Sequence, residues 1–196
     1  MQKRGEAVKE VIIDASSRSF REVGYMSASV DSIAKLAGVS KATLYSHFSN
    51  KEGLFRATVE AFVAPILEVV PSAKPSADVR DELTKFAQRI SNMLLTPEKL
   101  EWDRMMVATA KTFPNLARDY FKAGPERALR QLGEFLQVQS EAGTLHVEDA
   151  RFSAEMFCGM LFGTRILRNL IFAQAAPLEP SHISRSIDAF LKVHTS

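Results

Sequence analysis

The chain has 196 residues and a net charge of +2; hydrophobic residues make up 46% of it, with nine glycines and eight prolines. These values are typical of a globular protein with a packed core, and they argue against a disordered chain and a turn-rich all-β fold. The N-terminus has no apolar run of signal-peptide type, and the most apolar run, 156–164, is too short to span a bilayer. We therefore expect a cytoplasmic protein that does not enter a membrane.

Helical periodicity dominates the chain, and no alternating strand pattern stands out. The first predicted helix covers 6–23 and ends at Gly24, and the second covers 30–37, with Ser29 as its N-cap. Further helices are predicted at 41–48, 51–70, 77–95, 97–113, 114–123, 125–142, 149–174 and 180–194. We therefore predict an all-α fold with three short helices in 1–50 and a larger helical bundle in 51–196.

The turn Gly38–Val39–Ser40 joins two short predicted helices, which is the helix-turn-helix arrangement. Gly38 can adopt the positive φ of such a turn, and Ser40 can cap the helix that follows. Leu44 and Phe48 anchor that helix on one face, so its other faces carry small and polar groups. The arrangement predicts DNA binding by 1–50; a generic helical hairpin with a polar surface is the alternative.

The polar faces of helix 41–48 suit the major groove of DNA. Ala42 allows contact with a thymine methyl group, and Lys41 can reach guanine acceptors or a phosphate. Phosphate oxygens can bind to the hydroxyl, imidazole and ammonium groups of Thr43, Tyr45, Ser46, His47 and Lys51. Residues 1–56 also carry nine Lys and Arg against six Asp and Glu, the excess of positive charge that an anionic partner favours.

The run SASVDSIAKLAGVSKATLYSHFSNKEGLF, residues 27–55, resembles the N-terminal domain of the TetR family of bacterial repressors. The resemblance implies that Ser40 and the residues just named occupy DNA-facing positions, and we add Ser29, the other cap, to the predicted DNA contacts. Ala28 departs from the pattern, because many members carry threonine there. That departure leaves Ser29 as the sole cap and puts a phosphate contact from position 28 in doubt.

The segment ATAKTFPNLARDYFKAGPERALRQL, residues 108–132, looks like the regulatory domain of AcrR/AefR-like members, many of which control efflux genes. The resemblance implies that the domain 51–196 binds a small apolar or amphipathic effector. The candidate lining residues are large, adaptable apolar groups at helical spacing, which otherwise form plain core. They are Phe86, Ile90, Met93, Trp102, Met105, Met106, Thr109, Phe113, Phe121 and Phe162.

The predicted helix 149–174 is unusually apolar and contains Gly159 and Gly163, two small residues four apart. A soluble helix of this kind must be buried, either within the chain or in a homodimer, where it pairs with helix 180–194 in a four-helix bundle. A twofold dimer also places two recognition helices on a palindromic operator. The candidate interface residues are Phe157, Gly159, Met160, Gly163, Leu167, Ile187, Phe190 and Leu191.

Enzymatic chemistry finds little support in the sequence. Nucleophile-elbow, zinc-protease and phosphate-loop motifs are missing, the four histidines are scattered, and Cys158 is the only cysteine, so we predict no catalytic residue, metal or cofactor. The expected function is a DNA-binding regulator, most simply a repressor released by its effector. A helical ligand-binding or adaptor protein with a vestigial helix-turn-helix, and an enzyme or redox sensor that uses Cys158, remain open alternatives.

Overall fold

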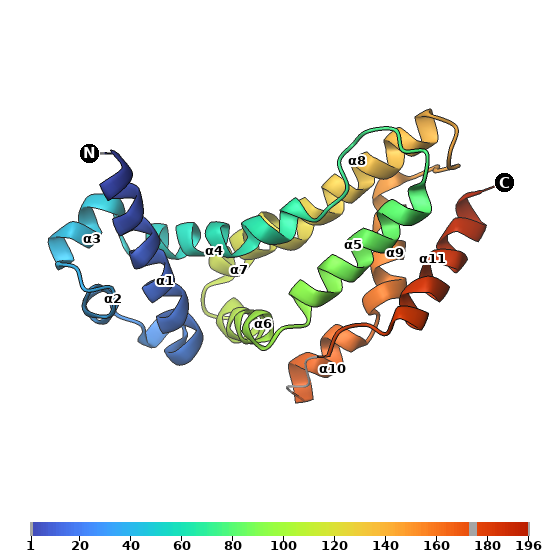
Figure 1. The fold of residues 1–196 in the computed structure, drawn as a ribbon. Helices are drawn as coiled ribbons and strands as arrows, with labels where there is room; N and C mark the ends of the chain where they lie inside the picture. Colours follow the sequence, from blue (N-terminus) through green and yellow to red (C-terminus); the bar gives the residue numbers. More distant parts are fainter. Residues whose placement is uncertain (1, 173–175, 196) are drawn as a thin grey trace. The chain divides into compact units, whose positions relative to one another are not determined.

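The computed structural model describes residues 2–172 and 176–195, with side chains from residue 5 onward. This part of the chain forms eleven α-helices and one π-helical turn and contains no strand, which confirms the all-α prediction. None of these helices is long and apolar enough to cross a membrane. In chain order (Figure 1) they are α1 (Gln2–Ser27), α2 (Val30–Leu36), α3 (Lys41–His47), α4 (Lys51–Glu68), α5 (Val79–Leu94), α6 (Pro97–Ala110), α7 (Pro114–Phe121), the π turn η1 (Lys122–Glu126), α8 (Arg127–Glu141), α9 (Ala150–Phe162), α10 (Arg165–Phe172) and α11 (Pro180–His194).

The helices form two compact units. Unit 1 comprises Met1–Ala64 and Glu101–Ala123, and unit 2 comprises Pro65–Leu100 and Gly124–Ser196. These units differ from the predicted domains, because most of α4 and the segment 101–123 cluster with the first three helices. The predicted boundary at residue 50 follows the three short N-terminal helices, and it stays a prediction.

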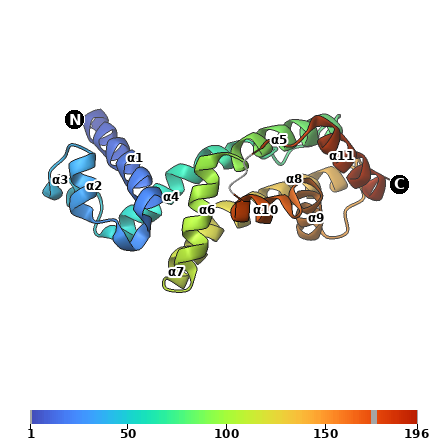
Figure 2. The ribbon, with the colours of Figure 1, turned by 90° about the horizontal axis from the view of Figure 1, so that it is seen from below.

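Local sequence signals explain the first three helices of unit 1, which lie together in Figures 1 and 2. Gly24 has non-helical angles (φ 77°, ψ 163°) within α1, so the predicted break is present, and one more turn follows it. The Ser29 hydroxyl accepts a hydrogen bond from the Ser32 amide at 3.0 Å, and Ser32 bonds back to Ser29. Gly38 has a φ of 66°, as the turn before α3 requires.

Aromatic rings fill the rest of unit 1. Trp102 on α6 is fully buried and stacks on Tyr120 of α7, with their ring centres 6.3 Å apart. Phe55 on α4 lies 5.9 Å from Trp102 and 5.2 Å from Tyr25 at the end of α1. These ring contacts connect α1, α4, α6 and α7, the helices of unit 1 that support α2 and α3.

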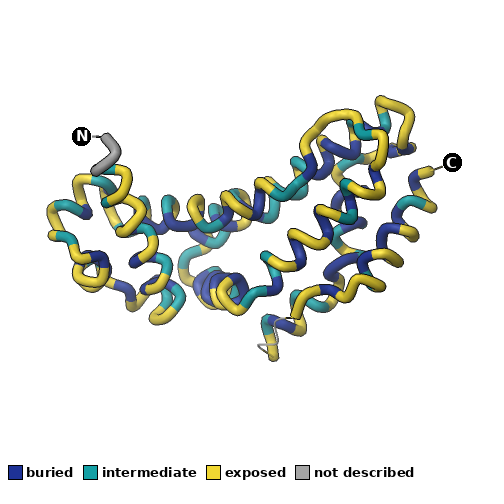
Figure 3. The backbone as a smooth tube through the Cα atoms, in the orientation of Figure 1, coloured by how far each residue is buried: buried dark blue, intermediate teal, exposed yellow. Residues whose placement is uncertain are grey.

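Unit 2 is a bundle in which α8 packs on α9, and α11 packs on both α5 and α9. Its core includes Phe86, Phe157 and Phe190, and Figure 3 shows buried and exposed positions alternating along these helices. The segment before α5 is anchored by the fully buried Gln139, whose amide nitrogen donates to the Lys74 carbonyl at 2.7 Å. The segment between α4 and α5 is therefore fixed to the bundle rather than free.

Two helix predictions in unit 2 were wrong. The predicted helix 149–174 is two helices, α9 and α10, because Gly163 takes a φ of 44°, which a right-handed helix cannot contain; its last residues, 173 and 174, lie outside the described part. Helix 125–142 was expected to begin at Pro125. Pro125 lies instead inside η1, and α8 begins at Arg127, because the wider π turn accommodates the proline without a break.

Candidate nucleic-acid interface

The third helix, α3, is held by one apolar edge and leaves its other faces open. Leu44 is fully buried and Phe48, at the C-cap, is 6% exposed, whereas Tyr45 is 44% exposed. The other eight predicted DNA contacts are also exposed or partly exposed: Ser29, Ser40, Lys41, Ala42, Thr43, Ser46, His47 and Lys51. All nine predicted residues therefore have accessible surface; their contact with DNA stays a prediction.

Three hydroxyl groups on this surface are oriented by local hydrogen bonds. The Ser40 hydroxyl accepts from the Thr43 amide at 3.0 Å and lies 2.8 Å from the Thr43 hydroxyl, while the Ser46 hydroxyl donates to the Thr43 carbonyl at 2.7 Å. Ser40 thus caps α3 as predicted. Each hydroxyl group has one proton to donate. The Ser40 and Thr43 hydroxyls share one hydrogen bond, so one of their two protons remains for an acceptor such as a phosphate oxygen, whereas Ser46 can donate to phosphate only by releasing the Thr43 carbonyl.

Lys41, in the first turn of α3, is bound to another helix of the same unit. Its ammonium group lies 2.7 Å from a carboxylate oxygen of Asp31 on α2. The hydrogen bond with Asp31, and then its charge, raise the pKa of Lys41, although both side chains are largely exposed. Sequence reasoning missed this pair, because it depends on how α2 and α3 cross.

Lys51 is the first residue of α4 and contacts the end of α1. Its ammonium group lies 4.5 Å from the ring centre of Tyr25 and donates to the Met26 carbonyl at 3.2 Å. This partial burial lowers the pKa of Lys51, since the charged form loses solvent. Desolvation, and then the charge of Glu52, raise the pKa of Tyr25. The site predicted from the sequence did not include Tyr25 or Met26, because their contacts with Lys51 depend on how α1 and α4 pack.

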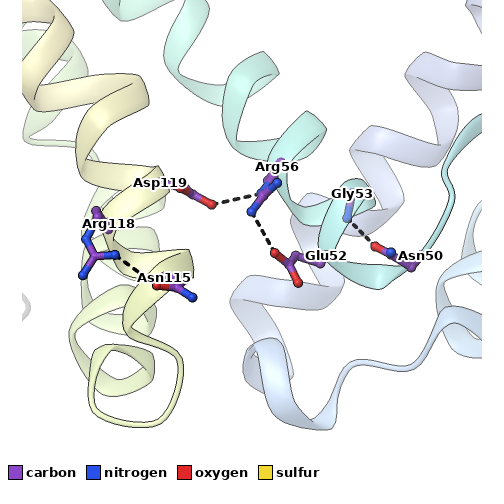
Figure 4. A network of polar contacts seen from close by, with 7 residues as sticks. All are labelled: Asn50, Glu52, Gly53, Arg56, Asn115, Arg118 and Asp119. Carbon is purple, nitrogen blue, oxygen red and sulfur yellow. Dashed lines mark hydrogen bonds and ion pairs between the residues drawn. The ribbon is translucent and has the colours of Figure 1, made fainter.

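Polar contacts also fix the start of α4 (Figure 4). The Asn50 side-chain oxygen accepts from the Gly53 amide at 2.8 Å and so caps this helix. One turn later, Arg56 donates to Glu52 at 2.8 Å and to Asp119 on α7 at 2.9 Å. The N-terminus of α4, which carries Lys51, is thereby held to α7 within unit 1.

The ten residues predicted to line an effector pocket divide between the two units. Unit 1 holds Trp102, Met105, Met106, Thr109, Phe113 and Phe121, and unit 2 holds Phe86, Ile90, Met93 and Phe162. In unit 1, three of them (Met105, Thr109 and Phe113) line a cleft of about 430 Å³. In unit 2, three belong to the packed core and Met93 packs against it, while a cavity of about 570 Å³ is lined by residues from 73, 129–138 and 150–151.

The eight predicted dimer residues also fall into two groups. Phe157, Ile187 and Phe190 are fully buried within unit 2, and Met160 and Leu191 pack partly against its core. Gly159, Gly163 and Leu167 are exposed. A partner chain can cover only exposed atoms, so the buried three can support an interface from beneath but cannot form its contact surface.

Comparisons with known proteins agree with this arrangement. A family model described as "Bacterial regulatory proteins, tetR family" matches residues 12–58, and one described as "AefR-like transcriptional repressor, C-terminal domain" matches residues 81–195. A TetR-family transcriptional regulator from Mesorhizobium loti has a solved structure with a TM-score of 0.84 and 27% identity, covering 97% of this chain and 98% of that one. The flavonoid-responsive regulator FrrA has a TM-score of 0.81 and 30% identity, covering 96% of this chain and 97% of that one.

Matches to curated proteins are more local. The regulator YhgD of Bacillus subtilis is 47% identical over 47 residues, which are 24% of this chain and 25% of YhgD. The regulator YvkB of the same organism is 24% identical over 160 residues, 80% of each chain. The first match thus spans only a quarter of its relative, whereas the C-terminal family model alone covers more than half of this chain. The chain belongs to the TetR family of bacterial DNA-binding transcriptional regulators, which are not enzymes, and carries an AefR-like C-terminal domain.

Proposed function

We propose that this protein is a homodimeric repressor that binds a palindromic operator in the cytoplasm and leaves it when a small effector binds. The observation that carries the proposal is α3, which buries Leu44 and Phe48 and exposes polar groups over its remaining surface. Lys41 and Ala42 are proposed to read bases, and Thr43, Tyr45, His47 and Lys51 to bind phosphate. The description of the matched C-terminal family as a repressor supports the direction of regulation.

A dimer follows from how such helices meet DNA. Two recognition helices can enter successive major grooves only when a twofold axis places them about 34–36 Å apart. The exposed Gly159, Gly163 and Leu167 of unit 2 are the proposed contacts, with the buried Phe157, Ile187 and Phe190 holding α9 and α11 in place beneath them.

The proposed effector is a small apolar or amphipathic molecule. The printed name of FrrA describes that protein as flavonoid-responsive, and it shares 30% identity and a TM-score of 0.81 with this chain. Aromatic effectors are therefore the first class to test, and efflux genes are proposed targets. An effector acts by binding more tightly to a conformation with the wrong half-site spacing, which shifts the population away from DNA.

The test is a titration of the purified full chain against the DNA that flanks its own gene, followed by fluorescence anisotropy at several salt concentrations. The repressor account predicts that one flanking fragment is retained and that the logarithm of its affinity falls linearly with the logarithm of salt. Retention that is independent of salt contradicts the phosphate contacts. Failure to retain any flanking or genomic fragment supports the ligand-binding or adaptor alternative.

A further inference from the structure

Unit 1 contains a cleft that is separate from the surface of α3. It has a volume of about 430 Å³ and lies between the end of α1, residues 21–26, and the α6 side of the unit, residues 101–113. Both walls belong to the same compact unit. A volume of this size is within the usual range for a small-molecule site.

The apolar part of the cleft is suited to a flat ring. Tyr25 and Phe113 both line it, and their ring centres lie 5.2 Å apart in an edge-to-face arrangement. Met26 and Met105 add thioether side chains, which adapt their shape to aromatic surfaces. Ala108, on α6, has a small side chain and so leaves space between these larger groups.

The polar part of the cleft carries two guanidinium groups. Its charged lining groups are Arg21, Arg104 and Glu101, two guanidinium groups against one carboxylate. The Arg21 side chain is only 14% exposed and donates to Glu101 at 3.0 Å. Arginine binds carboxylates through paired hydrogen bonds, so two guanidinium groups in the lining favour a ligand that carries one carboxylate. We propose that this cleft binds a small aromatic carboxylate.

Two residues that line the cleft also contact Lys51. Tyr25 lines the cleft and also lies beneath the Lys51 ammonium group at 4.5 Å, and Met26 lines it while its carbonyl accepts from Lys51 at 3.2 Å. Gly24, with a φ of 77°, turns the chain into this segment. A ligand that orders Tyr25 and Met26 stabilises the contacts that these two residues make with Lys51. This step rests on the proposed function. While Lys51 contacts Tyr25 and Met26 it does not bind phosphate, so binding of the ligand and binding of DNA weaken each other.

Methionine methyl groups provide a site-resolved test on the full chain. The protein contains seven methionines, of which Met26 and Met105 line the cleft, while Met93, Met156 and Met160 pack against the core of unit 2. In a protein labelled with ¹³C at the methionine methyl groups, 2-naphthoate is expected to shift the Met26 and Met105 signals saturably. The neutral analogue 2-naphthylmethanol is expected to bind at least about tenfold more weakly, because it forms no charge-assisted hydrogen bonds.

Variants on α6 separate a binding site from a nonspecific effect. Ala108→Phe fills the cleft and is expected to abolish the shifts, whereas the matched Val107→Phe, at a neighbouring position that is 68% exposed and outside the lining, is expected to preserve them. Arg104→Gln keeps the helix and the cleft but is expected to remove the preference for 2-naphthoate over 2-naphthylmethanol. Lys51→Ala is expected to weaken 2-naphthoate binding, because the Lys51 contact that orders Tyr25 is lost.

Each outcome decides a separate question. The site is overturned if 2-naphthoate does not shift Met26 and Met105, or if it shifts only Met93, Met156 and Met160. It is also overturned if Ala108→Phe binds 2-naphthoate as tightly as the wild type does. An unchanged 2-naphthoate affinity in Lys51→Ala overturns the coupling to Lys51. None of these results alters whether the protein retains operator DNA, so failure of the cleft and failure of the repressor account remain distinguishable.

Discussion

Asp31 on α2 holds Lys41, the first residue of α3, through a contact of 2.7 Å between carboxylate oxygen and ammonium nitrogen. Both partners are more than half exposed, so the pair contributes little to stability and its main consequence is electrostatic. In the proposed complex, DNA competes with Asp31 for Lys41 and also approaches the Asp31 charge. The carboxylate is therefore expected to weaken binding to any DNA sequence.

Asp31→Asn is accordingly expected to raise the affinity for duplex DNA by about two- to fivefold, the range of a released surface ion pair. Fluorescence anisotropy on operator and unrelated duplexes measures the change. Asp14→Asn is the matched control, because Asp14 is an exposed carboxylate paired with Arg18 on α1, 3.1 Å away. Weaker DNA binding by Asp31→Asn would show that the carboxylate helps to place Lys41 rather than restraining it.

The anchoring of α3 can be tested without DNA. Leu44 is fully buried, so Leu44→Ala is expected to reduce the free energy of unfolding of unit 1 by about 2–5 kcal/mol. Leu36→Ala, at a position on α2 that is 46% exposed, is expected to change it by less than about 0.5 kcal/mol. Denaturant titration followed by the fluorescence of Trp102, the only tryptophan, reports on unit 1 directly. Equal effects of the two variants would mean that Leu44 does not anchor the helix.

The proposed dimer surface can be disrupted without disturbing the chain. A Cβ atom added at Gly159 meets nothing within 4 Å, so Gly159→Glu is expected to fold and to run as a monomer in size-exclusion chromatography with light scattering. Gly5→Glu is the matched control, since a Cβ atom added at Gly5, on α1, also meets nothing within 4 Å. A dimeric Gly159→Glu variant would move the interface away from this face of α9.

Cys158 is predicted to be a packing residue rather than a sensor. Burial, and then the charge of Glu155, raise the pKa of its thiol to about 12. At pH 8, native Cys158 is therefore expected to react with a disulfide reagent on the order of a hundredfold more slowly than the denatured chain, whose thiol pKa is about 8.5. Comparable rates in the native and denatured states would restore the redox-sensor alternative.

The same shift predicts how stability depends on pH. The unfolded thiol loses its proton above about pH 8.5, whereas the folded thiol keeps it until about pH 12. The stabilisation is therefore complete below pH 8.5 and is lost as the pH rises toward 12. Denaturant titrations of wild type and Cys158→Ala at pH 7 and pH 10 are expected to show a steeper loss of stability in the wild type.

Local signals predicted the parts of the fold that local chemistry determines. The caps at Ser29 and Ser40, the positive φ at Gly38 and the buried edge of Leu44 and Phe48 all depend on residues within a few positions of each other. Periodicity also located the helices, but it could not distinguish a continuous helix from one broken at Gly163, because a single backbone angle leaves no periodic pattern.

Contacts between distant elements were beyond reach of the sequence. Two of these contacts, Asp31 with Lys41 and Tyr25 with Lys51, depend on how helices cross. The burial of Phe157 inside unit 2 also depends on helix packing. Residue type and spacing indicated which groups could meet DNA. Tertiary structure was needed to show that two of the cations are already engaged by other side chains.

The most direct test of DNA recognition by α3 and the start of α4 is affinity for a duplex selected from genomic fragments, compared among wild type, Tyr45→Ala, Lys51→Ala and the control Lys111→Ala. Lys111 is exposed and follows α6, away from α3 in the sequence. The account predicts that Tyr45→Ala and Lys51→Ala each weaken binding about tenfold, the usual loss for a hydrogen bond to a charged group, with an unchanged oligomeric state. Wild-type affinity in both variants would contradict it.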